Sequence, residues 1–128
     1  MQNISIEKTD NSPKIIMNIQ KGVIELEGNS YPENTFEFYK PFIEGLTNYF
    51  ELHEKEKTTI NFKLKYFNSA TSQTLFNIFD IIQEKKTNQV KINWYYDLND
   101  ENALNDYEDF NEEFEQLNIQ AVAFDSNI

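Results

Sequence analysis

The sequence predicts an α/β fold in which a mixed sheet of about five strands carries helices packed mainly on one face. Two observations lead to this prediction. Segments in which apolar and polar residues alternate, as in strands, are followed by segments whose apolar residues recur every three or four positions, as in helices. The alternating segments also keep a polar side, whereas strands covered by helices on both faces read as continuous apolar runs. We therefore expect one face of the sheet to be partly open.

The first part of the chain predicts a β-hairpin. Apolar residues recur at every second position over 15–20, as in a strand, and Lys21-Gly22 has the composition of a tight turn. Residues 23–27 would form the return strand. Gly28-Asn29-Ser30 is expected to end that strand.

The rest of the chain predicts alternating helices and strands. The first helical stripe comprises Tyr39, Phe42, Ile43, Leu46 and Phe50. Pro41 falls inside this stripe, so it should lie in the first turn or kink the helix, and 32–39 would be an approach loop. Strands at 59–66, 90–96 and 119–124 and helical stripes at 75–82 and 103–117 follow. This succession predicts right-handed crossovers and parallel pairing in the middle of the sheet.

Length and composition predict a single domain spanning 1–128. The chain has 128 residues, of which 39% are hydrophobic, with only three glycines and three prolines. It should therefore fold around one core rather than remain disordered. Residues 1–13 are expected to form a loose N-terminal lead-in, which could include a short edge strand around Ile4–Ile6.

The charge balance excludes several classes of function. The chain carries 22 acidic and 11 basic residues, giving a formal net charge of -11. Such a charge repels nucleic-acid phosphates and anionic lipid surfaces, so we expect neither a nucleic-acid nor a membrane partner. The first ten residues lack the apolar stretch of a signal peptide, and no apolar run is long enough to cross a bilayer. A cytoplasmic location is expected.

The residue types that catalysis needs are scarce. The chain has no cysteine and a single histidine, His53, in a charged stretch that predicts a solvated helix end. This nearly excludes nucleophilic triads and histidine-rich metal sites. Carboxylates are too abundant for any pair to be informative, and the isolated glycines form no phosphate-binding loop. We expect a protein that is not an enzyme and binds no cofactor or metal; a small carboxylate-dependent enzyme is the weakest alternative.

A group of hydroxyl residues marks the junction between the strand at 59–66 and the helix that follows. The segment is Asn68-Ser69-Ala70-Thr71-Ser72, in which Asn68 or Ser69 is expected to cap the helix by accepting backbone N–H bonds. A hydroxyl at a helix N-terminus can also be a phosphorylation site, because the helix dipole and free N–H groups tolerate a phosphate. The added charge of about -2 would still change what docks there. Capping and switching are compatible.

A second segment, Ser30 to Tyr39, combines aromatic and polar residues. One interpretation is a staple that fixes the start of the first helix. The other is a binding surface, because aromatic side chains beside polar groups are common interface anchors. The candidate partner-binding residues are Tyr31, Pro32, Glu33, Asn34, Phe38 and Tyr39, together with Asn68.

Several of these segments together resemble the SiaC family of bacterial regulatory phosphoproteins. They are Gly28-Asn29-Ser30-Tyr31-Pro32-Glu33-Asn34, Phe38-Tyr39, Tyr66-Phe67-Asn68-Ser69, and Trp94-Tyr95-Tyr96-Asp97 with Asp100-Glu101. Their order follows the family pattern across most of the chain. The resemblance implies a STAS-like fold, as in anti-sigma-factor antagonists, and a protein that is not an enzyme.

The resemblance also implies a pathway. Members of the family are phosphorylated on a hydroxyl by a dedicated kinase and dephosphorylated by a PP2C-like phosphatase. The unphosphorylated form activates a diguanylate cyclase, which raises cyclic-di-GMP and favours biofilm formation. The family's phosphorylated residue corresponds to Ser69, a serine in place of a threonine, with Thr71 and Ser72 as alternatives. An anti-sigma-factor antagonist acting by partner switching is the alternative function.

Overall fold

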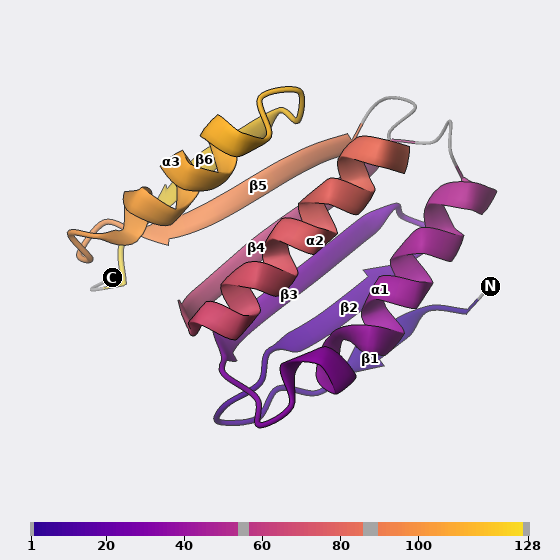
Figure 1. Cartoon of the computed structure of the whole chain (residues 1–128), viewed down its shortest axis with the longest axis horizontal. Coiled ribbons are helices and arrows are strands. Elements are labelled where there is room, and N and C mark those ends of the chain that lie inside the picture. The colour runs from indigo at the N-terminus through magenta and orange to yellow at the C-terminus, as the bar shows by residue number, and fades with distance from the viewer. Residues whose placement is uncertain (1, 54–56, 86–89, 127–128) are drawn as a thin grey trace.

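The computed structural model describes residues 2–53, 57–85 and 90–126 (Figure 1). In chain order, the elements are β1 (Ile4–Ile6), β2 (Lys14–Asn18), β3 (Val23–Ser30), α1 (Thr35–Leu52), β4 (Thr58–Phe67), α2 (Ser69–Lys85), β5 (Val90–Asp97), α3 (Ala103–Glu113) and β6 (Ile119–Phe124). No helix in these ranges is both long and apolar enough to cross a membrane. The α/β class predicted from the sequence is confirmed.

The strands form one mixed sheet in the order β1-β2-β3-β4-β5-β6. The pairs β1–β2 and β2–β3 are antiparallel, whereas β3–β4, β4–β5 and β5–β6 are parallel. The predicted hairpin is confirmed, with Gly22 at a φ of 66° in its turn. The predicted parallel centre of the sheet is confirmed as well.

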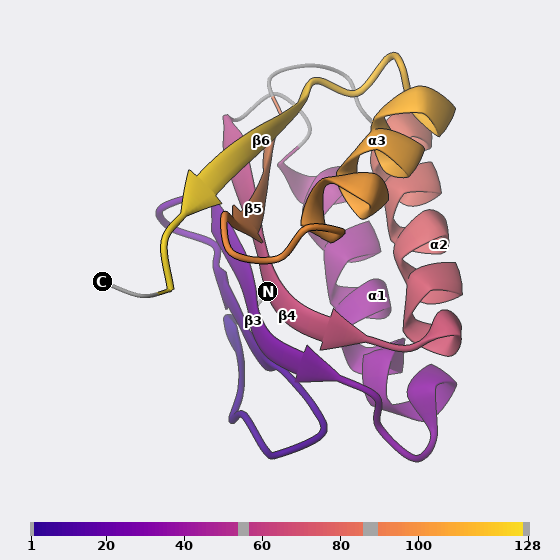
Figure 2. The same ribbon diagram turned by 90° about the vertical axis from the view of Figure 1, so that its left-hand side faces the viewer.

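All three described helices cover the same face of the sheet, as the side view in Figure 2 shows. The core lies between the two layers. Alternate side chains of the strands, including Ile24, Ile60 and Phe62, meet Phe42 and Leu46 of α1 and apolar residues of α2 there. Polar side chains such as Lys63 and Asn61 occupy the opposite face, so the expected open face is present.

The N-terminal segment is more ordered than expected. The short edge strand considered around Ile4–Ile6 is present and pairs with β2, so the sheet has six described strands, in keeping with the expected number of about five. The following turn is also fixed, since the backbone N–H of Tyr31 donates to the carbonyl of Asn11 at 2.8 Å and Ser12 is buried. Residues 2–13 are therefore not a loose lead-in.

Two element boundaries also correct the predictions. Helix α1 begins at Thr35, within the expected approach loop, because the Asn34 side chain accepts the N–H of Glu37 at 3.1 Å and starts the helix. Pro41 therefore lies beyond the first turn, on the exposed side of the helix. Strand β3 also continues to Ser30 instead of ending at Gly28, whose φ of 120° is accessible to glycine.

Candidate functional site: the β4–α2 junction

Asn68 builds the junction between β4 and α2. Its side-chain oxygen accepts the backbone N–H of Thr71 at 2.9 Å, and its carbonyl accepts the N–H of Ser72 at 2.9 Å. Its own N–H donates to the carbonyl of Ser30, at the end of β3, at 3.2 Å. Asn68 therefore caps the helix, as predicted, and also attaches its start to the neighbouring strand.

The three hydroxyls of the junction lie in different environments. Ser69 is the first residue of α2 and is exposed, and Ser72 is half-buried. Thr71 is completely buried. A kinase must reach the hydroxyl it modifies, so of the three candidates Ser69 has the accessibility that phosphorylation requires and Thr71 lacks it.

The Thr71 hydroxyl belongs to a buried network that joins three elements. It donates to the carbonyl of Ser30 at 2.9 Å, and its oxygen lies 2.9 Å from Ser30 Oγ. Ser30 Oγ in turn lies 2.6 Å from the Tyr39 hydroxyl, on α1. Burial raises the pKa of Tyr39 to about 12, and the hydrogen bond with Ser30 opposes part of that rise. The network thus keeps a neutral phenol inside the core.

Exposed aromatic side chains occur on both strands that lead to the junction: Tyr66 is three residues before Ser69, and Tyr31 follows Ser30, whose carbonyl accepts the Asn68 N–H. Tyr31 and Tyr66 form an edge-to-face pair, with ring centroids 5.5 Å apart and planes inclined at 71°. They are 40% and 57% exposed, and Phe36, in the first turn of α1, is 73% exposed. Large apolar side chains in water are typical of surfaces that bind partners.

The position of Tyr66 was not predictable from the alternation of β4, which places it on the inner side with Ile60, Phe62 and Leu64. Between the pairs Gly28–Leu64 and Ser30–Phe67, β3 advances by two residues while β4 advances by three. The extra residue in β4 breaks the alternation, so Phe67 packs against the core and Tyr66 lies outside.

The carboxylates of the chain form no metal-binding group in the described residues. Asp97 is half-buried, and its pKa is lowered by the backbone N–H of Asn99 and by the Ser126 side chain. The pKa of Asp106 is raised by burial and by the charges of Asp109 and Asp100. Asp97 thus accepts hydrogen bonds within a turn, and Asp106 lies near other carboxylates at the start of α3, an arrangement that suits loop and helix structure.

Comparison with known proteins decides the family. The model of the SiaC family of regulatory phosphoproteins matches residues 6–124. This chain belongs to the SiaC family. An uncharacterised protein of Pseudomonas aeruginosa strain UCBPP-PA14 is 26% identical over 115 residues, which are 88% of this chain and 90% of that protein. The resemblance inferred from the sequence is thereby confirmed, and with it the description of regulatory phosphoprotein.

Solved structures of SiaC from P. aeruginosa share the fold. One, covering 97% of this chain and all of the other, has a TM-score of 0.87 at 23% identity. Another belongs to the crystal structure of diguanylate cyclase SiaD with its activator SiaC. It has a TM-score of 0.88 at 24% identity, covering 94% of this chain and 99% of the other. The STAS-like description of this SiaC-family fold stays a prediction.

The candidate partner-binding residues of this SiaC-family chain divide into three groups. Tyr31, Glu33 and Asn34 are exposed, and Asn34 also caps α1. Pro32, Phe38 and Asn68 are half-buried. Tyr39 is completely buried, because its ring belongs to the helical stripe of α1, and so it offers no surface to a partner in this structure. His53, expected to be a solvated helix end, is half-buried, with its ring stacked 5.1 Å from Tyr49.

Proposed function

We propose that this chain is a binding protein, not an enzyme, whose docking to a partner is controlled by phosphorylation of Ser69. The observation that carries the proposal is the exposure of Ser69 at the first position of α2, three residues after Tyr66, which forms an exposed pair with Tyr31. Modification and docking would therefore share one surface. Membership of a family of regulatory phosphoproteins supports the same mechanism.

The position of Ser69 explains how the fold would survive a phosphate. The first turn of α2 presents backbone N–H groups and the positive end of the helix dipole, both of which favour an anion. The cap does not depend on the Ser69 side chain, since Asn68 provides it. Phosphorylation is therefore expected to change the surface and leave the core unchanged.

The same phosphate would oppose docking. A partner that covers Tyr31 and Tyr66 and extends to the start of α2 would also remove water from Ser69. For a neutral hydroxyl this desolvation is inexpensive, whereas for a phosphate of charge about -2 it is costly unless the partner supplies cations. The unphosphorylated form is accordingly the binding form.

The partner we propose is a diguanylate cyclase, because the related SiaC is an activator of diguanylate cyclase SiaD. A cognate protein kinase and a PP2C-like phosphatase would set the level of phosphate on Ser69. A diguanylate cyclase consumes GTP, so the proposed site of action is the cytoplasm, with cyclic-di-GMP and biofilm formation as the output.

The first test maps the modification. The chain is incubated with ATP and the proposed cognate kinase, and the phosphate is located by mass spectrometry. We expect phosphate on Ser69 and its loss in Ser69→Ala. Ser72→Ala is the matched control, because it removes a hydroxyl from the same turn. Phosphate on Ser72, or on a residue outside the junction, would contradict the proposal.

The second test measures docking. Binding to the proposed diguanylate cyclase partner is measured by calorimetry for the unmodified chain, the Ser69-phosphorylated chain and Ser69→Ala. We expect tight binding of the unmodified chain and of Ser69→Ala even after kinase treatment, and weak binding of the phosphorylated chain. Ser69→Glu should be weakened less, since one carboxylate imitates a phosphate imperfectly. Equal binding of all forms would refute control by Ser69.

A further inference from the structure

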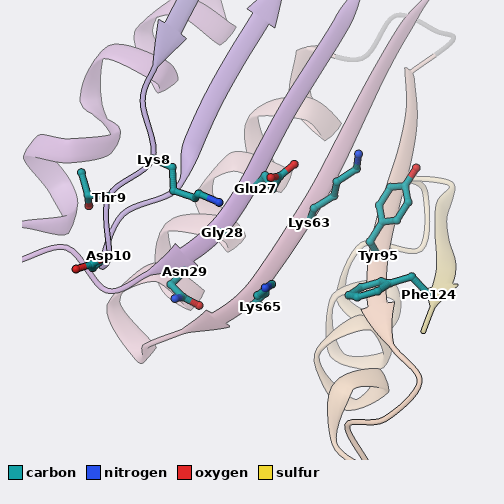
Figure 3. A pocket seen from close by; sticks show the side chains of 10 residues that line it. All are labelled: Lys8, Thr9, Asp10, Glu27, Gly28, Asn29, Lys63, Lys65, Tyr95 and Phe124. Carbon is teal, nitrogen blue, oxygen red and sulfur yellow. The ribbon is translucent and has the colours of Figure 1, made fainter. Parts of the chain in front are cut away.

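A second surface feature lies on the open face of the sheet, opposite the helices. It is a cavity of about 530 Å³, which we call the open-face pocket. Figure 3 shows its lining, in which Lys8, Lys63 and Lys65 stand with Tyr95 and Phe124 around a floor that includes Gly28. None of the junction hydroxyls lines it. The pocket therefore needs a separate explanation.

The sheet arranges one side of the pocket. Lys63 Nζ lies 5.0 Å from the centre of the Tyr95 ring, on the neighbouring strand, and 3.2 Å from Glu25 Oε1. Phe124 pairs with Asp97 across β5 and β6, two positions beyond Tyr95. Phe124 is 37% exposed and makes no ring contact with another aromatic side chain of the described residues. Its ring is available for a ligand.

Gly28 allows the N-terminal segment to reach the pocket. A Cβ at Gly28 would approach Lys8 Cδ to 2.9 Å, so the absence of a side chain leaves room for Lys8 to lie across β3. The segment is itself fixed, because the N–H of Thr9 donates to the carbonyl of Ser12 at 3.0 Å. Lys8 is thus brought from outside the sheet to the same pocket as Lys63 and Lys65.

The charge of the pocket differs from that of the whole molecule. The chain has a net charge of -11, but three lysines and two acidic residues, Asp10 and Glu27, line the pocket. Neither Lys8 nor Lys65 forms an ion pair with a carboxylate of the described residues. Carboxylates of the helices lie on the other side of the sheet, and physiological salt screens charges more than about 8 Å apart. Two cations therefore remain available to an anion.

We propose that the open-face pocket binds a small phosphate ester that carries a flat ring, of the size of a mononucleotide. The volume lies within the range of small-molecule sites. Lysine ammonium groups bind phosphate as point charges, and an exposed aromatic ring stacks on a base. Glu27 can accept hydrogen bonds from sugar hydroxyls, and Asn29 can accept or donate them. This inference does not depend on phosphorylation of Ser69.

The test is a titration of the isotope-labelled full chain, followed by NMR, with AMP and GMP as probes. Ribose 5-phosphate, adenosine and inorganic phosphate separate the contributions of ring and phosphate. We expect saturable shifts at Gly28, Asn29, Lys65 and Phe124 with the nucleotides, and affinity weaker by roughly tenfold for ribose 5-phosphate, which has no base to stack. No shifts at millimolar nucleotide, or shifts confined to residues outside the pocket, would overturn the proposal.

Variants locate the contacts. Phe124→Ala and Lys65→Gln change exposed side chains, so the fold should persist, and each should weaken nucleotide binding by at least about fivefold. Lys91→Gln is the matched control, because Lys91 lies on the same sheet face outside the pocket. Equal weakening by Lys91→Gln would indicate unspecific attraction and refute the pocket. Weakened binding of the cyclase in the pocket variants, without nucleotide binding, would assign the face to a protein partner and equally refute it.

Discussion

Two hydrogen bonds join Thr71 and Ser30. The threonine hydroxyl donates to the serine carbonyl at 2.9 Å, and the two hydroxyl oxygens lie 2.9 Å apart. One donor order satisfies every atom: Tyr39 donates to Ser30 Oγ, Ser30 donates to Thr71, and Thr71 donates to the Ser30 carbonyl. Three elements, β3, α1 and α2, thus meet in one buried network. Ser69, two residues before Thr71, is held at the surface by that arrangement.

Replacing Thr71 should therefore affect stability. Thr71→Val keeps the shape and removes the hydroxyl, which leaves the Ser30 carbonyl and hydroxyl with fewer partners in the core. We expect the free energy of unfolding to fall by about 1–3 kcal/mol, the cost of an unsatisfied buried polar group. Urea unfolding followed by circular dichroism measures it. Ser72→Val is the control; an equal loss there would show that the hydroxyl network contributes little.

Asn68 should matter through its cap. Asn68→Ala removes the acceptor for the Thr71 N–H, and we expect a loss of about 0.5–2 kcal/mol in the free energy of unfolding. Asn68→Asp keeps an acceptor and should retain most of the stability. Hydrogen exchange of the first-turn amides of α2 provides a second measurement. Unchanged exchange in Asn68→Ala would show that water replaces the cap without cost.

Both predictions concern a segment that the sequence describes only partly. The sequence predicts the strand, the helix and the cap because each depends on neighbouring residues. It does not separate Ser69, Thr71 and Ser72, because the burial of Thr71 depends on Ser30, 41 residues away in the chain. For the same reason the sequence misses the exposure of Tyr66, which follows from a register shift between β3 and β4.

At the start of α1 the sequence gives a clear local signal, but the fold overrides it. Pro41 argues against a helix interior, and so the sequence predicts a loop up to Tyr39. In the structure the Asn34 cap and the buried apolar stripe from Tyr39 onward outweigh the lost hydrogen bond of Pro41. Burial against the rest of the fold decides where such a helix begins, and the helix propensity of the local sequence does not include this contribution.

The Tyr39 phenol should make stability depend on pH in the alkaline range. Its pKa is about 12 in the folded chain and about 10 when unfolded, so the unfolded state loses its proton first. The contribution is fully present below pH 10 and is lost as the pH rises from 10 to 12. The loss amounts to about 2–3 kcal/mol in the free energy of unfolding.

Urea unfolding between pH 9 and pH 12, compared with Tyr39→Phe, measures this contribution. The variant has no group to ionise at this position, so its stability should fall less steeply over that range. The starting stability of Tyr39→Phe will be lower, because Ser30 loses one partner, and so the slopes are compared rather than the absolute values. Parallel slopes would show that Tyr39 ionises in the folded chain as it does in the unfolded one.

Tyr31 and Tyr66 should carry much of the binding energy of the proposed partner. Both rings are exposed, and they hold each other in an edge-to-face contact, so little entropy is lost when a partner covers them. Tyr66→Ala should weaken docking by about 2 kcal/mol or more, as at interface hot spots, and change stability little. Leu52→Ala is the matched control, because Leu52 is 65% exposed at the other end of α1. Calorimetric titration with the cyclase measures the affinity of each variant. Equal affinities for Tyr66→Ala and Leu52→Ala would place the docking surface elsewhere. A phosphate on Ser69 would then act at a different contact.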